Sequence, residues 1–197
     1  MEIMRLIVTG AVDTGKSSLV RAVSEIKTVD IEPQATAQTS LLQGKATIAL
    51  DYGRVHFDPD MSIQLYGTPG QPRFDFIWDM LMRRAHASIV LVAANRPGNF
   101  HSTSRLLSFM ETRVQIPMII GLTHTDCPGA WSMEDVAIAL GYANPKTRPT
   151  MVKVNPTQKA SVVKALRTLV EQYRSRKSSV ASSQLPMINY LRSTIAA

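Results

Sequence analysis

The sequence has little of what builds a secreted, disulfide-linked or membrane-spanning protein. Cys127 is its only cysteine in 197 residues, so no internal disulfide can form and a reducing cytosol is the expected compartment. No apolar run approaches the length of a spanning helix, and the N-terminus lacks the charged-then-apolar layout of a signal peptide. Aromatic residues make up only 6% of the chain, and there is no RNA-binding motif, so nucleic acid is not expected as a partner.

The remaining composition is that of an ordinary globular protein. Hydrophobic residues make up 45% of the chain and charged residues 19%. The length suits one domain with a good core and a short appendage. The formal net charge of +7 fits contact with anionic lipid or nucleic acid, and it equally fits a nucleotide site and a charged tail.

The most informative stretch lies near the N-terminus, where an apolar run (residues 3–8) leads into GAVDTGKSS and then into apolar residues at helical spacing. This is the pattern G-x-x-x-x-G-K-S between a strand and a helix, which cradles polyphosphate with backbone N–H groups. Lys16 is expected to reach the outer phosphates, and the Ser17 hydroxyl to ligate Mg²⁺. The residues of this loop expected to contact nucleotide are Gly10, Ala11, Val12, Asp13, Thr14, Gly15, Lys16, Ser17 and Ser18.

The rest of the chain alternates strands with helices, which predicts a mostly parallel sheet covered on both faces. A polar stretch at 27–45 reads as a long loop, and a hairpin of strands at 46–57 and 61–66 follows it. The later elements are expected as helices at 74–85, 101–114, 132–140 and 157–173, and as strands at 88–94, 117–122 and 151–154.

Two further loops bear on nucleotide chemistry. The sequence LTHTD (122–126) ends an apolar strand, and a carboxylate at Asp126 could accept hydrogen bonds from guanine N1–H and its exocyclic amine, a donor pair that adenine lacks. The loop GTPGQ (67–71) follows a strand and precedes a predicted helix. The carboxylate of Asp126 therefore favours guanine over adenine nucleotides.

The order of the loops resembles the Ras superfamily. The stretches TIALDYG (47–53), LYGTPGQPRFDFIWDML (65–81) and LTHTD resemble more closely the small bacterial Ras-like GTPases, including the gliding-motility (Mgl) GTPase and the conservon GTP-binding proteins. The resemblance covers residues 1–173. It implies a three-layer P-loop NTPase sandwich, with a mostly parallel sheet and one antiparallel edge strand.

The resemblance also implies roles for particular residues. Gly70 would meet the γ-phosphate, Gln71 would orient the attacking water, and Thr47 would join Ser17 on Mg²⁺. Gly67 departs from the family pattern, because the family keeps there an aspartate that holds Mg²⁺ through water. The residues expected to contact the base are Thr123, His124, Asp126, Asn155, Pro156 and Thr157. Proline has no N–H for guanine O6, so Asn155 or the Thr157 amide would have to compensate for Pro156.

These expectations describe a switch protein that binds GTP or GDP with Mg²⁺ and hydrolyses GTP slowly. The family implies a Roadblock/LC7-type regulator or activating partner and an effector in polarity, motility or signalling. Val12, Gly67 and Pro156 leave open a pseudo-GTPase scaffold with little turnover, and a third alternative is an ATP-dependent P-loop protein. The tail 174–197 is basic and serine-rich. This composition is typical of a disordered end, of a segment that docks on a partner, or of a segment that weakly contacts the inner face of the membrane.

Overall fold

The computed structural model of the protein describes residues 1–27, 29–31, 50–69 and 81–195. Its elements in chain order are β1 (Glu2–Gly10), α1 (Lys16–Val23), β2 (Val29–Ile31), β3 (Leu50–Asp58), β4 (Met61–Gly67), β5 (Ala87–Ala93), the 3₁₀ turn η2 (Pro97–Asn99), α3 (Phe100–Arg113), β6 (Met118–Thr123), α4 (Met133–Ala139), β7 (Thr150–Lys153) and α5 (Lys159–Ile195).

The strands of the described residues form one sheet in the order β2-β3-β4-β1-β5-β6-β7. β1 lies in the middle, parallel to β4 and β5, and β6 and β7 continue the parallel arrangement. β3 runs antiparallel to both β4 and β2. The predicted α/β sandwich is therefore confirmed, but β3 is not at the edge, because β2 pairs outside it. Three residues inside a polar stretch show too little alternation to be recognised as a strand.

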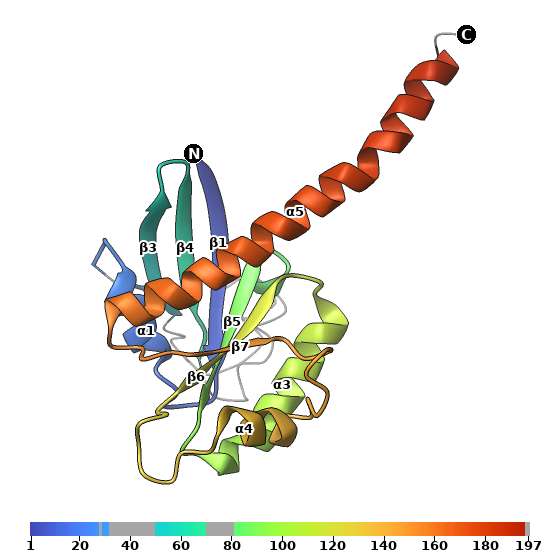
Figure 1. Ribbon diagram of the computed structural model, residues 1–197. Helices are drawn as coiled ribbons and strands as arrows, with labels where there is room; N and C mark the ends of the chain where they lie inside the picture. The colour runs from blue at the N-terminus through green and yellow to red at the C-terminus, as the bar shows by residue number, and fades with distance from the viewer. Residues whose placement is uncertain (28, 32–49, 70–80, 196–197) are drawn as a thin grey trace, which may run out of the picture.

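Helices cover both faces of the sheet, as its continuous apolar strands require (Figure 1). On β1, Leu6 and Val8 pack with α1 and α5, while Ile7 between them packs with α3 and α4. The same alternation divides β5, where Ile89 and Leu91 face one layer and Val90 and Val92 the other. Successive side chains on a strand point to opposite faces, so β1 and β5 each contribute to two cores.

The helix ends agree with the sequence in one case and differ in two. Ser132, the first residue of the helix predicted at 132–140, caps α4, its hydroxyl accepting a hydrogen bond from the Asp135 N–H at 3.1 Å. The apolar residues at helical spacing after the phosphate loop run on to Ile26, but α1 ends at Val23 and Ile26 lies beyond it. α5 does not end at Tyr173 but continues as one helix to Ile195, and Figure 1 shows it projecting beyond the sheet. None of the helices in the described residues has the apolar length that a membrane crossing needs.

The parallel topology gathers the functional loops at one edge. β1, β4 and β6 end at Gly10, Gly67 and Thr123, and each precedes a loop that the sequence associates with nucleotide. In open α/β sheets, ligands bind in the crevice outside the carboxyl ends of the strands. The fold therefore brings the phosphate loop and the predicted guanine loop to the same end of the sheet.

A close approach of α1 to β3 depends on Gly53. A Cβ atom at Gly53 would lie 2.8 Å from Cγ1 of Val20 and 3.1 Å from Cβ of Ser24. We expect Gly53→Ala to lower the free energy of unfolding by about 1–3 kcal/mol through overpacking. The control is Gly98→Ala, because a Cβ there meets nothing within 4 Å. Thermal denaturation should show a clear fall in Tm for Gly53→Ala and almost none for Gly98→Ala; equal shifts would contradict the packing argument.

Candidate functional site

The phosphate loop has the backbone form of an anion cradle. Gly10 and Gly15 adopt positive φ values of +140° and +92°, and Asp13 lies in the left-handed region at +59°. In the described part of the chain, no acceptor takes the backbone N–H groups of residues 12–17. Unpaired N–H groups beside a helix N-terminus form a concave site for phosphate. Glycine adopts these φ values without the steric penalty of a side chain, and at Gly10 a Cβ would also collide with the Leu91 carbonyl.

Lys16 places a buried cation against this cradle. Its side chain is 9% exposed, and its ammonium donates a hydrogen bond to the Ala11 carbonyl at 2.6 Å. Burial lowers the Lys16 pKa to about 8, with Asp13 and Asp51 acting in the opposite direction. Thr14 donates its hydroxyl to the same carbonyl at 3.0 Å, so Ala11 keeps a partner if Lys16 moves to a phosphate. The site therefore holds a positive charge that an anion would stabilise.

Arg96 is a neighbour of the phosphate loop that the sequence did not single out. It follows β5, and its guanidinium donates to the Asp13 carboxylate at 2.9 Å. This ion pair offsets the negative charge that Asp13 brings to the loop. A lone arginine in the sequence NRPG carries no signal of this contact, since the pairing follows from β5 lying beside β1.

Asp51 is the second residue that sequence reasoning missed. The Ser17 hydroxyl donates to Asp51 Oδ2 at 2.5 Å, and the Arg21 guanidinium lies 4.0 Å from Oδ1. Asp51 pairs in register with Gly67, on the adjacent strand. A Cβ at Gly67 would lie 3.0 Å from the Asp51 Cβ, so the aspartate side chain covers the glycine.

The predicted guanine loop is tied to the phosphate loop through Thr123. This residue is fully buried, and its hydroxyl donates to the Thr14 carbonyl at 3.1 Å. His124 Nδ1 lies 2.9 Å from the same hydroxyl oxygen and would donate to it in the Nδ1-protonated form. His124 adopts a left-handed φ of +55°, and Asp126 two residues later is exposed. Thr123 thus holds the two loops together and leaves Asp126 accessible.

The last predicted base loop also reaches the phosphate loop. Pro156 is buried against Gly15, where an added Cβ would lie 2.6 Å from the proline Cγ. The Thr157 amide donates to Asn155 Oδ1 at 3.1 Å. That amide is therefore already engaged and not available to replace the N–H that Pro156 lacks. Of the two compensating groups that the sequence left open, the Asn155 side-chain amide is the one whose N–H donors meet no acceptor among the described residues.

For three residues of the predicted site, the proposed roles are not tested by the structure. Thr47, Gly70 and Gln71 lie outside the described residues, so their roles in holding Mg²⁺, meeting the γ-phosphate and orienting water remain predictions. The structure brings together the other predicted residues at the carboxyl ends of β1, β6 and β7. These are Gly10, Ala11, Val12, Asp13, Thr14, Gly15, Lys16, Ser17, Ser18, Thr123, His124, Asp126, Asn155, Pro156 and Thr157.

Comparisons with known proteins agree with a nucleotide-binding fold. The model of the family described as conserved hypothetical ATP binding proteins matches residues 34–186, most of the chain. The chain belongs to this family. An uncharacterised protein of Methanocaldococcus jannaschii is 27% identical to it over 133 residues, covering 62% of the chain and 82% of that protein.

A solved small GTPase has the same fold as this protein. The structure of Arl6 (BBS3) from Trypanosoma brucei, with a bound GppNp analogue, aligns at a TM-score of 0.64 and 14% identity, covering 88% of the chain and 99% of the GTPase. The likeness shows that the chain has the α/β fold of small GTPases. The Mgl-type and conservon group is not among these findings, and the Ras-like resemblance holds at the level of the fold.

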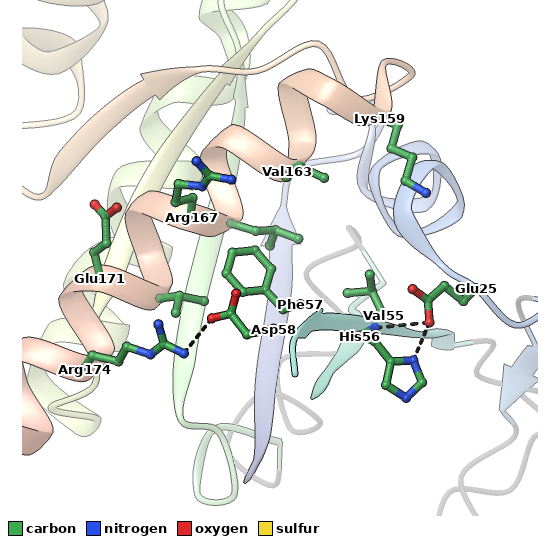
Figure 2. Close-up of a pocket in the computed structure, with 12 residues that line it drawn as sticks. Glu25, Val55, His56, Phe57, Asp58, Lys159, Val163, Arg167, Glu171 and Arg174 are labelled. Carbon is green, nitrogen blue, oxygen red and sulfur yellow. Dashed lines mark hydrogen bonds and ion pairs between the residues drawn. The ribbon is translucent and has the colours of Figure 1, made fainter. Parts of the chain in front are cut away.

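A separate pocket of about 320 Å³ lies on the face that α1 and α5 cover (Figure 2). Figure 2 shows Arg174 of α5 reaching Asp58 of β3, at 2.6 Å, and Glu25 reaching His56, also at 2.6 Å. The hydrogen bond from His56 lowers the Glu25 pKa. None of the residues lining the pocket belongs to the predicted nucleotide loops. The pocket is therefore separate from the predicted nucleotide loops.

The hydrogen bond from the Thr123 hydroxyl to the Thr14 carbonyl should contribute measurably to the free energy of unfolding. Thr123→Val keeps the shape but leaves the buried Thr14 carbonyl without this donor, so we expect a loss of about 1–3 kcal/mol in the free energy of unfolding. In a domain of this size that is a fall in Tm of about 2–4 °C per kcal/mol. Thr112→Val, on the exposed surface of α3, is the matched control and should change Tm little. Equal denaturation curves for the two variants would show that the tie contributes nothing to stability.

Proposed function

We propose that this protein is a small GTP-binding switch that binds GTP or GDP with Mg²⁺ and hydrolyses GTP slowly. The observation that carries the proposal is the hydrogen bond from Thr123 to Thr14, which fixes the loop bearing Asp126 against the phosphate loop. A polyphosphate bound over residues 12–17 would then have its base directed toward Asp126. Nucleotide binding itself has support from the family and from the fold.

The proposal favours guanine although the family description names ATP. Asp126 is exposed, with no side-chain partner among the described residues, so its carboxylate is free to accept two hydrogen bonds. Guanine offers N1–H and an exocyclic amine to such an acceptor. Adenine offers no matching pair and would leave the carboxylate unpaired in the complex.

Several residues would hold Mg²⁺ with the nucleotide. The Ser17 hydroxyl is a hard oxygen donor beside the phosphate cradle, and the Asp51 carboxylate lies next to it. An ion held by these groups would supply positive charge against the phosphate oxygens. Thr47 is proposed as a further Mg²⁺ ligand, and Lys16 as the group that stabilises charge on the outer phosphates.

Slow hydrolysis is proposed because the site has few groups to speed it. Val12 is exposed at the phosphate loop and would crowd an arginine supplied by a partner. Gln71 is proposed to orient the attacking water and Gly70 to meet the γ-phosphate. The alternative function is a pseudo-GTPase scaffold that binds guanine nucleotide with little turnover, which the departures at Gly67 and Pro156 favour.

The biological setting is proposed from the family resemblance. A Roadblock/LC7-type regulator or another activating partner would act on the nucleotide state, and an effector in bacterial polarity, motility or signalling would read it. The protein is proposed to act in the cytoplasm. The basic residues of α5 beyond Tyr173 would supply a weak contact with the inner face of the membrane.

The test is nucleotide competition followed by single-turnover hydrolysis. Unlabelled GDP, GTP, ADP and ATP would each displace a fluorescent GDP analogue from the full chain in Mg²⁺. Guanine nucleotides should compete far better than adenine nucleotides, and equal competition by ATP would reject the guanine assignment. Hydrolysis of bound GTP, alone and with a candidate regulator, then separates the switch from the scaffold, since a scaffold retains the nucleotide in both cases.

A further inference from the structure

The end of β4 has a glycine where a metal-binding carboxylate would be useful. Gly67 is the last residue of β4, beside β1 and its phosphate loop, and it is buried. Glycine supplies no group toward Mg²⁺. Its hydrogen atom leaves space above the strand, and the surrounding residues determine what fills that space.

Asp51 fills it from the next strand. Asp51 and Gly67 are register partners in the antiparallel pair of β3 and β4, so their side-chain positions lie on the same face. A Cβ built at Gly67 would lie 3.0 Å from the Asp51 Cβ and 3.3 Å from Oδ2. The carboxylate of Asp51 therefore lies where a side chain at Gly67 would begin.

The orientation of this carboxylate is fixed toward the phosphate loop. Oδ2 accepts a hydrogen bond from the Ser17 hydroxyl at 2.5 Å, and the Asp51 side chain is only 16% exposed. A hydroxyl that donates its proton to a carboxylate keeps its lone pairs for a metal ion, and such outer partners orient a ligand and raise its basicity. Ser17 is thus prepared to ligate, and Asp51 is the group that prepares it.

The donors also fit the preferences of Mg²⁺. This ion keeps several waters and binds through one or two carboxylates together with substrate phosphates. Across the described residues, no three His, Cys, Asp or Glu side chains cluster as a metal site. One hydroxyl and one carboxylate are therefore a suitable protein share only when a nucleotide supplies the remaining oxygens.

We propose that Asp51 on β3 supplies the Mg²⁺-positioning carboxylate that Gly67 on β4 lacks. Asp51 would orient the Ser17 hydroxyl toward the ion, and the lack of a side chain at Gly67 leaves the space that the Asp51 carboxylate occupies. The inference rests on the proposed binding of Mg²⁺ with nucleotide. It also gives Gly67 a reason other than loss of function, and so favours the switch over the scaffold.

The experiment measures how Mg²⁺ slows the release of a fluorescent GDP analogue. Dissociation rates are recorded over a Mg²⁺ titration and in EDTA for the wild type, Asp51→Asn and the control Asp60→Asn, an exposed aspartate in the turn after β3. Asp51→Asn should raise the Mg²⁺ concentration for half-maximal slowing by about tenfold or more, since hydrogen bonds to charged groups contribute about 1.5–3 kcal/mol. Asp60→Asn should match the wild type at every Mg²⁺ concentration and in EDTA.

A second variant tests the exchange of positions. Gly67→Asp alone should crowd Asp51, whereas Asp51→Gly combined with Gly67→Asp should recover part of the Mg²⁺ response that Asp51→Gly loses. An Asp51→Asn titration equal to the wild type would overturn the assignment, as would a wild type that binds GDP with no Mg²⁺ response. If the wild type binds no guanine nucleotide even in EDTA, the proposed function fails instead. Should Asp51→Asn unfold, the double variant decides, and no recovery in a folded double variant overturns the proposal.

Discussion

Replacing Lys16 with methionine should remove most of the affinity for nucleotide while leaving the protein folded. The ammonium is buried beside the phosphate loop, so a bound polyphosphate would pair with it in a poorly solvated place. Truncating one member of such a buried charged pair costs about 2–5 kcal/mol, which corresponds to roughly 30- to 4,000-fold in Kd. Titration of fluorescent GDP in Mg²⁺ measures the loss directly.

Stability separates this effect from misfolding. Burial lowers the Lys16 pKa, so the charged ammonium destabilises the ligand-free protein relative to its solvated form. Ala11 keeps the Thr14 hydroxyl as a donor when Lys16 is removed. The Tm of the ligand-free Lys16→Met variant should therefore equal or exceed that of the wild type. The matched control is Lys164→Met, an exposed lysine on α5, and it should bind GDP normally. Normal GDP affinity in Lys16→Met would contradict the placement of phosphate at this loop.

The phosphate loop could be predicted from the sequence because its signals are local. The positive φ values at positions 10 and 15 favour glycine there, and Lys16 and Ser17 follow at fixed spacing within one strand–loop–helix unit. The two-faced sheet could be predicted for a similar reason, since long apolar runs such as residues 88–94 indicate strands buried on both sides.

The features that sequence reasoning missed depend on contacts between distant segments. Asp51 lies 34 residues from Ser17, and Arg96 lies 83 residues from Asp13. Asp51 lies in the stretch TIALDYG that carries the family resemblance, but no role followed for it from the sequence, and Arg96 lies in no such stretch; each becomes meaningful only when strand order places its side chain beside the phosphate loop. The continuation of α5 past Tyr173 was missed because a serine-rich, basic composition resembles a linker, although helix can continue through residues of modest propensity.

The base preference should change when Asp126 is replaced by asparagine. The carboxylate offers two acceptors to guanine, whereas a carboxamide offers one acceptor and one donor. The donor would face the exocyclic amine of guanine, so we expect the affinity for GDP to fall by about 100-fold. Xanthine carries a carbonyl oxygen in place of that amine and would accept the new hydrogen bond. Asp126→Asn should therefore bind xanthosine diphosphate better than GDP, reversing the preference of the wild type.

A reversal of this kind cannot arise from general damage to the site, because the phosphate contacts are the same for both nucleotides. Competition of GDP, xanthosine diphosphate and ADP against a fluorescent diphosphate measures it, with Asp60→Asn as the control for the loss of one surface charge. If both nucleotides lose affinity equally, Asp126 supports the loop without contacting the base. If ADP competes best in the wild type and Asp126→Asn leaves that order unchanged, the base lies elsewhere and the family's description as ATP-binding applies to this chain. Reversal would instead assign guanine recognition to the loop that Thr123 holds against the phosphate site.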